Sequence, residues 1–174
     1  MIEIRALQPG DDRSQFRSGD PDIDRFFLRF AGQNQFRHHL GVTYAAVETG
    51  QILGFVTVSA AQVESANLPD VMRRRLPGYP LPALRLSRLG VAETAKGRGL
   101  GSALVRFAFG MAHEMADRVG CTGVLVDAKP GAVAFYDKLG FRPCETMNGE
   151  LGDRPMPTLM FLGLGAIPRV PPPP

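Results

Sequence analysis

The chain has 174 residues, of which 44% are hydrophobic and 21% charged, and its formal net charge is +3 at pH 7. This length fits one domain, and the hydrophobic fraction is ordinary for a globular protein. No apolar run reaches the ~18–20 residues that a membrane span needs, and the N-terminal segment carries acids where a signal peptide would be apolar. We therefore expect a cytoplasmic protein without a membrane partner.

The N-terminal segment predicts a strand followed by a helix. Ile2 and Ile4 alternate with charged residues, the period of a strand, and turn residues follow at 9–12. Asp20 and Pro21 then mark a helix start. The apolar side chains of this helix recur at helical spacing, and we expect them in the core: Ile23, Phe26, Phe27, Phe30 and Ala31.

The middle of the chain predicts a hairpin and a later buried strand. Gly50 lies in the turn that separates two β-rich runs. The expected elements are strands at Thr43–Val47 and Ile52–Ser59, a short helix at Val71–Leu76, a rigid loop at Pro77–Pro82 and a strand at Leu84–Val91 buried on both sides.

The last part of the chain alternates helices and strands. The longest helical signal, Gly99–Arg118, ends at Gly120, and its apolar face comprises Leu100, Leu104, Phe107, Ala108, Met111, Met115 and Val119. After it we expect a strand at Val124–Val126, a helix from Pro130 to a cap at Gly140, and strands at Glu145–Met147 and Pro157–Leu164 around the turn Asn148-Gly149. This order predicts a single α/β domain with a mixed sheet over residues 1–164, and an extended proline-rich tail outside the core over residues 165–174.

The two cysteines predict neither a disulfide framework nor a metal site. Cys121 and Cys144 are too few for the former, and their separation matches no zinc ligand spacing. We expect both to be packing residues.

A glycine-rich junction between a strand and a helix is the most informative motif. It reads Lys96-Gly97-Arg98-Gly99-Leu100-Gly101 and opens the long helix. Glycines let backbone N–H groups approach an anion, and a helix start adds unpaired N–H groups and partial positive charge. With two cations beside it, this junction favours a diphosphate.

Two other phosphate motifs fit less well. The Walker pattern is absent, and a dinucleotide pattern that starts at Gly97 and Gly99 meets Ser102 where its last glycine belongs. A flexible glycine turn without a ligand is the remaining alternative.

A second motif follows on the next helix, where Phe135 and Tyr136 precede Leu139-Gly140-Phe141. Taken together, the two motifs resemble the GNAT superfamily of N-acetyltransferases. Gly99 and Gly101 match the family's two cradle glycines, whereas Lys96 stands where the family usually has Gln or Arg. The resemblance implies a GNAT fold: a central, mostly antiparallel mixed sheet flanked by helices, whose central strands splay apart at the acetyl-coenzyme A cleft.

The resemblance also implies site residues. Leu89, Gly90 and Val91 would pair with the pantetheine arm, with the Val91 N–H polarising the thioester carbonyl. The backbone from Arg98 to Ser102 would bind the pyrophosphate. Tyr136 would be the general acid that protonates the departing thiolate. Further cofactor contacts are expected from Lys96, Gly97, Lys129, Ala132 and Phe135.

The sequence identifies no general base. An α-amino group, with a pKa near 7.7–8.0, is already partly neutral at pH 7 and needs little help. Glu64 and Asp127 are possible bases directly or through water, but each also fits a structural or solvated role. His113, on the long helix, is expected at the surface.

A narrower resemblance links the chain to GNAT toxins of bacterial toxin–antitoxin pairs. It rests on residues 16–19, 23–27, 31–35, 79–82, 86–91 and 126–129. It implies acetylation of the α-amino group of aminoacyl-tRNA, which halts translation, together with a ribbon-helix-helix antitoxin and a homodimer. The cations that would meet tRNA phosphates are Arg73, Arg74, Arg75, Arg85 and Arg88.

Two other functions remain open at this stage. One is a GNAT enzyme that acetylates a small-molecule or protein amine, and the other is an acyl-coenzyme A sensor without catalysis. A solvated helix face also explains the run of arginines at residues 73–75 without any RNA.

Overall fold

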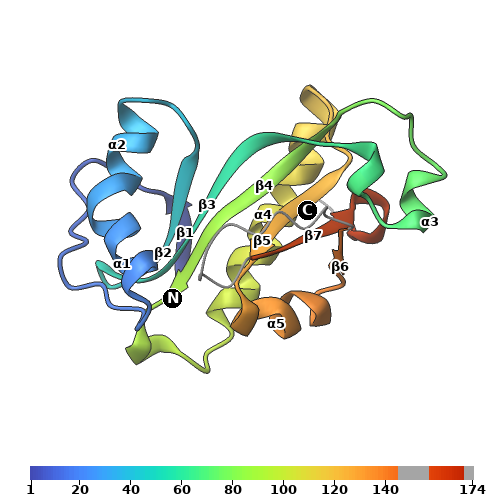
Figure 1. Cartoon of the computed structure of the whole chain (residues 1–174). Coiled ribbons are helices and arrows are strands. Elements are labelled where there is room, and N and C mark those ends of the chain that lie inside the picture. Colours follow the sequence, from blue (N-terminus) through green and yellow to red (C-terminus); the bar gives the residue numbers. More distant parts are fainter. Residues whose placement is uncertain (145–156, 171–174) are drawn as a thin grey trace. The chain divides into compact units, whose positions relative to one another are not determined.

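The computed structural model describes residues 1–144 and 157–170, which divide between two compact units. Unit 1 comprises Met1–Ser59 and Leu86–Ala108, and unit 2 comprises Ala60–Arg85 and Phe109–Pro174. Within the described residues, the strands hydrogen-bond in the order β1-β2-β3-β4-β5-β7-β6 (Figure 1). This strand order and the flanking helices confirm the predicted α/β class, while the single domain over residues 1–164 stays a prediction.

Unit 1 contains an antiparallel sheet built on the predicted hairpin. β1 (Glu3–Ala6) pairs with β2 (Val42–Glu48), which pairs in turn with β3 (Gln51–Val63). The turn between β2 and β3 has positive φ at Thr49 and Gly50 (48° and 80°), the conformation that a tight hairpin requires.

The N-terminal helix is interrupted by a π turn. It consists of α1 (Pro21–Arg25), the π-helical η1 (Phe26–Phe30) and α2 (Ala31–Phe36), and we call residues 21–37 the helical arm. Asp20 caps its start by accepting from the N–H groups of Asp22 and Ile23.

The π turn overturns the expectation that every phenylalanine of this helix is buried. The Ala31 N–H donates to the Phe26 carbonyl, five residues back, so the turn rotates the faces away from the regular α-helical pattern. Phe27 and Ala31 are buried, Phe26 is half-buried, and Phe30 is 45% exposed. The prediction of Phe30 in the core was therefore wrong.

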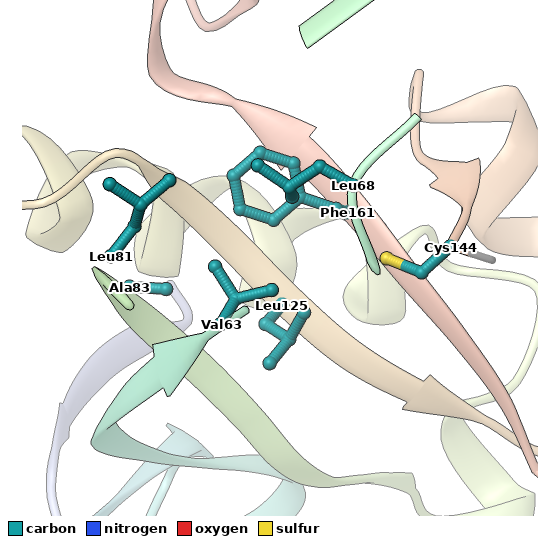
Figure 2. Close-up of a cluster of buried hydrophobic side chains, with 7 residues drawn as sticks. All are labelled: Val63, Leu68, Leu81, Ala83, Leu125, Cys144 and Phe161. Carbon is teal, nitrogen blue, oxygen red and sulfur yellow. The ribbon is translucent and has the colours of Figure 1, made fainter. Parts of the chain in front are cut away.

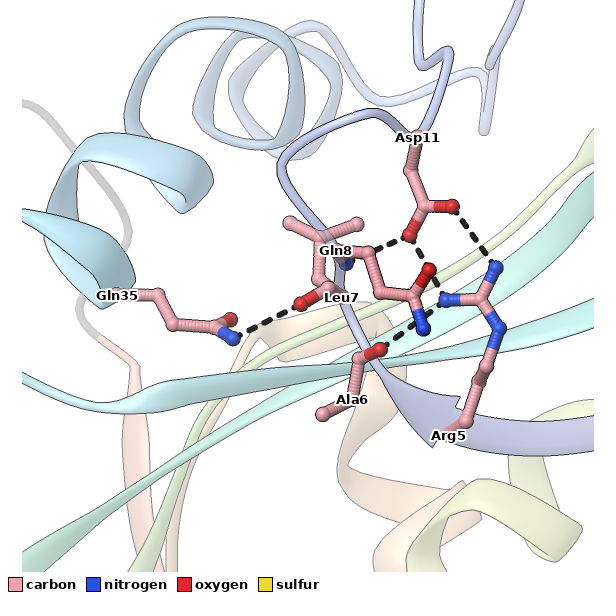
Figure 3. A network of polar contacts seen from close by, with 6 residues as sticks. All are labelled: Arg5, Ala6, Leu7, Gln8, Asp11 and Gln35. Atoms are coloured by element: carbon pink, nitrogen blue, oxygen red, sulfur yellow. Dashed lines mark hydrogen bonds and ion pairs between the residues drawn. The ribbon is translucent and has the colours of Figure 1, made fainter.

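Polar contacts fasten the helical arm to the sheet of unit 1 (Figure 3). The Gln35 amide donates to the Leu7 carbonyl at 3.0 Å and accepts from the Thr43 N–H at 2.9 Å. In the same network, Arg5 forms a two-point ion pair with Asp11, and this hydrogen bonding lowers the pKa of Asp11. Gln35 thus holds α2 against the end of β1 and the start of β2.

Close packing in unit 1 explains a glycine near the end of β4 (Leu81–Val91). Phe27 stacks on Phe55 with ring centroids 4.2 Å apart. A Cβ added to Gly90 would lie 2.8 Å from the Phe55 ring and 2.7 Å from the Ile23 side chain. Only a glycine fits this position without displacing core side chains.

Replacing Gly90 by Ala is expected to lower the free energy of unfolding by about 1–3 kcal/mol, because the added methyl group overpacks this core. Chemical denaturation measures the change. Gly110→Ala is the matched control: an added Cβ there meets nothing within 4 Å on α4 (Leu100–Arg118). That control is expected to stabilise by up to about 1 kcal/mol. Equal stability of wild type and Gly90→Ala would contradict the packing argument.

Helix α4 begins one residue later than predicted and ends at the predicted Arg118, but its last expected apolar position differs. Leu100, Leu104 and Ala108 are buried. Val119, however, is 79% exposed, so its assignment to the apolar face was wrong. The helix ends at Arg118 and the chain turns through Gly120, whose φ is 102°, so Val119 lies on the cap and outside the packed face.

Unit 2 pairs β5 (Gly123–Ala128) with β7 (Thr158–Gly163), and β7 with β6 (Arg142–Pro143), all antiparallel. β6 has only two residues, so no alternation of apolar and polar side chains could predict it from the sequence. The strand expected at Glu145–Met147 and the turn after it lie outside the described residues. The remaining elements are α3 (Asp70–Arg73), α5 (Val133–Lys138) and the short η2 (Ser65–Asn67), η3 (Glu93–Ala95), η4 (Pro130–Ala132) and η5 (Leu164–Ala166), of which only η3 belongs to unit 1.

Among the predicted bounds that change, two concern the segment before and within β4. The expected helix at 71–76 is the single turn of α3, and β4 starts three residues earlier than expected, inside the predicted loop. Leu81 and Ala83 belong to the buried cluster that Figure 2 shows, together with Val63, Leu68, Leu125, Cys144 and Phe161. Burial of Cys144 in this cluster raises the pKa of its thiol to about 11. Both cysteines are buried free thiols, which confirms their packing role.

The segment after β7 does not begin an extended tail at residue 165. The Ile167 side chain is buried, its carbonyl lies 2.8 Å from Nε2 of His113, and Arg169 forms a two-point ion pair with Asp117. The described segment therefore contacts α4 at two points, through the Ile167 carbonyl and the Arg169 side chain. His113 is correspondingly half-buried, with its Nδ1 enclosed, so its expected surface position was wrong.

Truncating Ile167 to Ala is expected to lower the free energy of unfolding by about 2–5 kcal/mol, the range for deleting a buried aliphatic side chain. Val170→Ala is the control, since Val170 is 88% exposed, and its effect is expected within about 0.5 kcal/mol. Thermal or chemical unfolding compares the two. Indistinguishable effects would contradict the packed C-terminal segment.

Candidate functional site

The glycine-rich junction in unit 1 has the backbone of an anion cradle. Gly97 and Gly99 adopt φ values of 80° and 75°, which favour glycine. The Ala103 N–H donates to the Gly99 carbonyl at 3.0 Å as the first bond of α4. The N–H groups of Leu100, Gly101 and Ser102 precede this bond, so the helix itself offers them no carbonyl.

Open space lies beside both left-handed glycines. A Cβ added to Gly97 or to Gly99 would meet nothing within 4 Å. The buried Leu100 side chain meanwhile anchors the first turn of α4 in unit 1. A fixed backbone bordered by open space, with helix N–H groups next to it, can accept an anionic group such as a diphosphate.

One cation of the cradle is held by an acid that the sequence did not single out. Arg98 donates two hydrogen bonds to Glu48, at 3.1 and 3.0 Å, from the junction to the end of β2. This pairing lowers the pKa of Glu48 and raises that of Arg98. Glu48 lies next to the predicted turn at Gly50, and nothing in a linear pattern pairs residues fifty positions apart. Lys96 is exposed.

The three residues expected to meet the pantetheine arm lie at the end of β4 in unit 1. Leu89 and Val91 are half-buried, and Gly90 is buried. The next residue is fixed, because the Ala92 N–H donates to the Leu53 carbonyl at 2.8 Å. The cradle and this strand end therefore belong to the same compact unit.

The candidate acid, Tyr136, lies on α5 in unit 2. Its side chain is 5% exposed, and burial raises its pKa to about 12. The rings of Phe135 and Phe141 pack edge-on against it, at centroid distances of 5.0 and 5.4 Å. The Phe141 N–H also donates to the Tyr136 carbonyl at 3.1 Å, after Gly140 turns the chain with φ 99°.

The burial of Tyr136 has a chemical consequence. A phenol with a raised pKa keeps its proton through the physiological pH range, so this side chain is a proton donor and not a phenolate. Of the other residues predicted in this part of the site, Lys129 is exposed, Ala132 is half-buried on η4 and Phe135 is half-buried on α5.

The predicted phosphate-binding arginines divide between the units. In unit 2, Arg73 pairs with Asp70 and Arg85 with Asp127, while Arg74 and Arg75 are exposed. In unit 1, Arg88 lies over the Phe26 ring, 5.0 Å from its centroid.

These contacts also bear on the general base. The Asp127 carboxylate is committed to Arg85, and Glu64 is exposed. Asp127 would have to leave Arg85 to act as a base, whereas Glu64 is open to solvent. Among the described residues, no group of three or more His, Cys, Asp or Glu side chains is arranged to hold a metal ion. Within the same residues, no helix has the length and apolar composition needed to cross a bilayer.

Comparisons with known proteins are consistent across sequence and structure. The model of the acetyltransferase (GNAT) domain matches residues 39–143. A tRNA-acetylating toxin of Mycobacterium tuberculosis (strain ATCC 25618 / H37Rv) is 35% identical over 140 residues, which cover 79% of this chain and 82% of that protein.

Two solved structures share the fold. AtaT complexed with acetyl-methionyl-tRNAfMet superposes with a TM-score of 0.84 at 24% identity, covering 96% of this chain and 97% of that one. A mutant AtaT toxin bound to the C-terminus of the antitoxin AtaR and acetyl-CoA gives a TM-score of 0.76 at 23% identity, covering 95% of each chain.

Proposed function

Because this chain belongs to the GNAT acetyltransferase family, we propose that it transfers acetyl from acetyl-coenzyme A to the α-amino group of an aminoacyl-tRNA. The observation that carries the substrate is the relative named as a tRNA-acetylating toxin, at 35% identity over most of both chains. The reaction is a direct attack of the amine on the thioester.

The cradle fits the cofactor by its own geometry. When bound, acetyl-coenzyme A supplies a thioester for acyl transfer and a pyrophosphate for recognition. The open space beside Gly97 and Gly99 admits the phosphates, and the N–H groups from Arg98 to Ser102 bind them. Lys96 and the Glu48-held Arg98 add positive charge. The further cofactor contacts proposed are those of Leu89, Gly90, Val91, Lys129, Ala132 and Phe135.

Tyr136 has the properties that its proposed role requires. The leaving thiolate must take up a proton, and a neutral phenol in a dry environment supplies it. Burial raises the pKa of Tyr136. Desolvation also raises the pKa of the coenzyme A thiol, so proton transfer from the phenol to the thiolate keeps its driving force. The Val91 N–H is proposed to polarise the thioester carbonyl. The α-amine of an aminoacyl group needs no strong base.

A charged tRNA requires cations on the protein. Arg74 and Arg75 are exposed next to α3, and Arg88 is exposed on β4. Arg73 and Arg85 have acidic partners that hold their guanidinium groups in place, and we propose that they too contact phosphates. A small-molecule amine does not need such cations, whereas tRNA phosphates do, so the exposed arginines support the RNA substrate. Against a sensor without catalysis, the proposal assigns Tyr136 a chemical role, and the Tyr136→Phe variant distinguishes that role from packing alone.

The same proposal includes how the protein is controlled and where it works. A ribbon-helix-helix antitoxin would neutralise it, the active form would be a homodimer, and both would be cytoplasmic. The antitoxin is supported by the antitoxin-bound structure of similar fold.

A translation extract supplied with labelled acetyl-coenzyme A tests this function. The protein is expected to stop translation and to place label on charged tRNA. The Tyr136→Phe variant, added at equal concentration, is the control and is expected to leave translation running. Normal translation in the presence of excess protein that still turns over acetyl-coenzyme A on another amine would refute the tRNA substrate.

A further inference from the structure

The helical arm presents an exposed face that the proposed chemistry does not use. The residues exposed along it after η1 begins are Arg29, Phe30, Gln33, Phe36 and Arg37, and we call them the aromatic–arginine stripe. Phe30 is 45% and Phe36 40% exposed. A single exposed apolar side chain needs no explanation, but an apolar patch rimmed by polar residues marks an interaction site.

The spacing places these residues on one side of the arm. Phe30 and Arg37 are seven positions apart, as are Arg29 and Phe36, so each pair is separated by about two helical turns. The stripe thus consists of two adjacent rows. One runs from Arg29 to Phe36 and the other from Phe30 to Arg37, so each row has one guanidinium and one aromatic ring. The π turn produces this face, since it lets Phe27 and Ala31 be buried while Phe30 is exposed.

The stripe is mounted on a fixed base. The Arg13 guanidinium donates to the Phe27 carbonyl at 3.1 Å. Gln35 donates to the Leu7 carbonyl after β1 (Figure 3) and accepts from the Thr43 N–H on β2. A ring on a fixed helix loses little freedom when a ligand stacks on it, so binding there costs little conformational entropy.

The charge of the stripe is positive and uncompensated. Among the described residues, neither Arg29 nor Arg37 forms an ion pair. The arm's two acids are engaged, Asp22 at 3.7 Å from Arg25 and Asp24 as acceptor from Ser18. The arm also carries Phe26, whose ring centroid lies 5.0 Å from the Arg88 guanidinium, so a further cation contacts the arm.

We propose that the aromatic–arginine stripe binds the single-stranded 3′ end of the tRNA substrate, with bases stacked on Phe30 and Phe36 and phosphates on Arg29 and Arg37. This rests on the proposed function and adds a binding surface to it. Sequence-tolerant binding of single strands combines aromatic platforms with cations along the backbone, which is the composition of the stripe. Both large apolar side chains exposed on the arm are aromatic, whereas a groove for an apolar peptide would be expected to expose aliphatic side chains.

The test compares two double variants of the full chain with different side-chain chemistry. Phe30→Leu with Phe36→Leu keeps apolar surface but removes the stacking rings, and Phe30→Tyr with Phe36→Tyr keeps the rings. The first is expected to raise KM for aminoacyl-tRNA about 5- to 150-fold for each base stack lost, with kcat and KM for acetyl-coenzyme A unchanged. The tyrosine variant is expected to behave as wild type. Circular dichroism and thermal unfolding verify that both fold.

Direct RNA binding separates this inference from the proposed function. Fluorescence anisotropy measures the affinity for deacylated tRNA, with and without its unpaired 3′ nucleotides, and needs no acetyl transfer. Removing those nucleotides is expected to weaken binding to wild type but not to the leucine variant, and Arg29→Ala with Arg37→Ala is expected to flatten the salt dependence. Equal affinities of wild type and leucine variant for intact tRNA would overturn the inference. Failure of wild type to acetylate charged tRNA, despite binding that depends on the stripe, would overturn only the proposed function.

Discussion

Replacing Tyr136 by Phe is expected to lower kcat for acetyl transfer about 10²- to 10⁴-fold, the usual contribution of a positioned general acid. The ring stays, so its edge-on contacts with Phe135 and Phe141 and the fold are retained. KM for acetyl-coenzyme A is expected to change little. Steady-state kinetics with saturating amine measure the effect, and Tyr79→Phe serves as the control because Tyr79 is exposed.

The pH profile gives this prediction a second readout. Burial raises the Tyr136 pKa to about 12, so the phenol remains a donor until the pH approaches that value. Activity is expected to rise with pH as the α-amine loses its proton, with a midpoint near 8, and to show no decline from Tyr136 below about pH 11. Folding stability follows the same shift: it falls from about pH 10 to 12, since the unfolded chain releases the proton first. A Phe variant with full kcat would show that Tyr136 only packs.

Replacing Gly99 by Val is expected to raise KM for acetyl-coenzyme A by about 10- to 100-fold, equal to about 1.4–2.8 kcal/mol of binding free energy. The position has φ 75°, which a β-branched residue rarely adopts, and its side chain would fill the open space of the cradle.

The control for this variant separates backbone strain from loss of the cradle. Gly120→Val introduces a similar strain, at φ 102°, where α4 has ended and no phosphate is proposed to bind. Both variants are expected to lose stability, but only Gly99→Val is expected to lose cofactor affinity. Isothermal titration with coenzyme A measures the difference. Equal cofactor affinity in the two variants would mean that the pyrophosphate is held elsewhere.

Features that depend on local backbone chemistry could be predicted from the sequence. The positions of Gly97, Gly99 and Gly140 in the sequence predict turns in the left-handed conformation, and each of these glycines has a positive φ. The hairpin at Gly50 follows in the same way. In these cases one residue type satisfies a steric demand that others do not, so a linear pattern is enough.

Features that depend on distant partners could not be predicted. The Glu48–Arg98 pair and the contact of His113 with Ile167 join residues about fifty positions apart. The π turn also escaped prediction, because a search at 3.6 residues per turn treats Phe30 as a continuation of the buried face. That irregularity created the stripe proposed to bind RNA. The strand expected at Glu145–Met147 lies outside the described residues, so it stays a prediction.

The most direct measurement of the central claim uses purified components. Charged tRNA is incubated with the protein and isotope-labelled acetyl-coenzyme A, digested to nucleosides, and its 3′-terminal aminoacyl-adenosine is analysed by mass spectrometry. Labelled acetyl on the α-amino group, absent with Tyr136→Phe, is the predicted result. Unmodified aminoacyl-adenosine under conditions in which the protein acetylates another amine would contradict it.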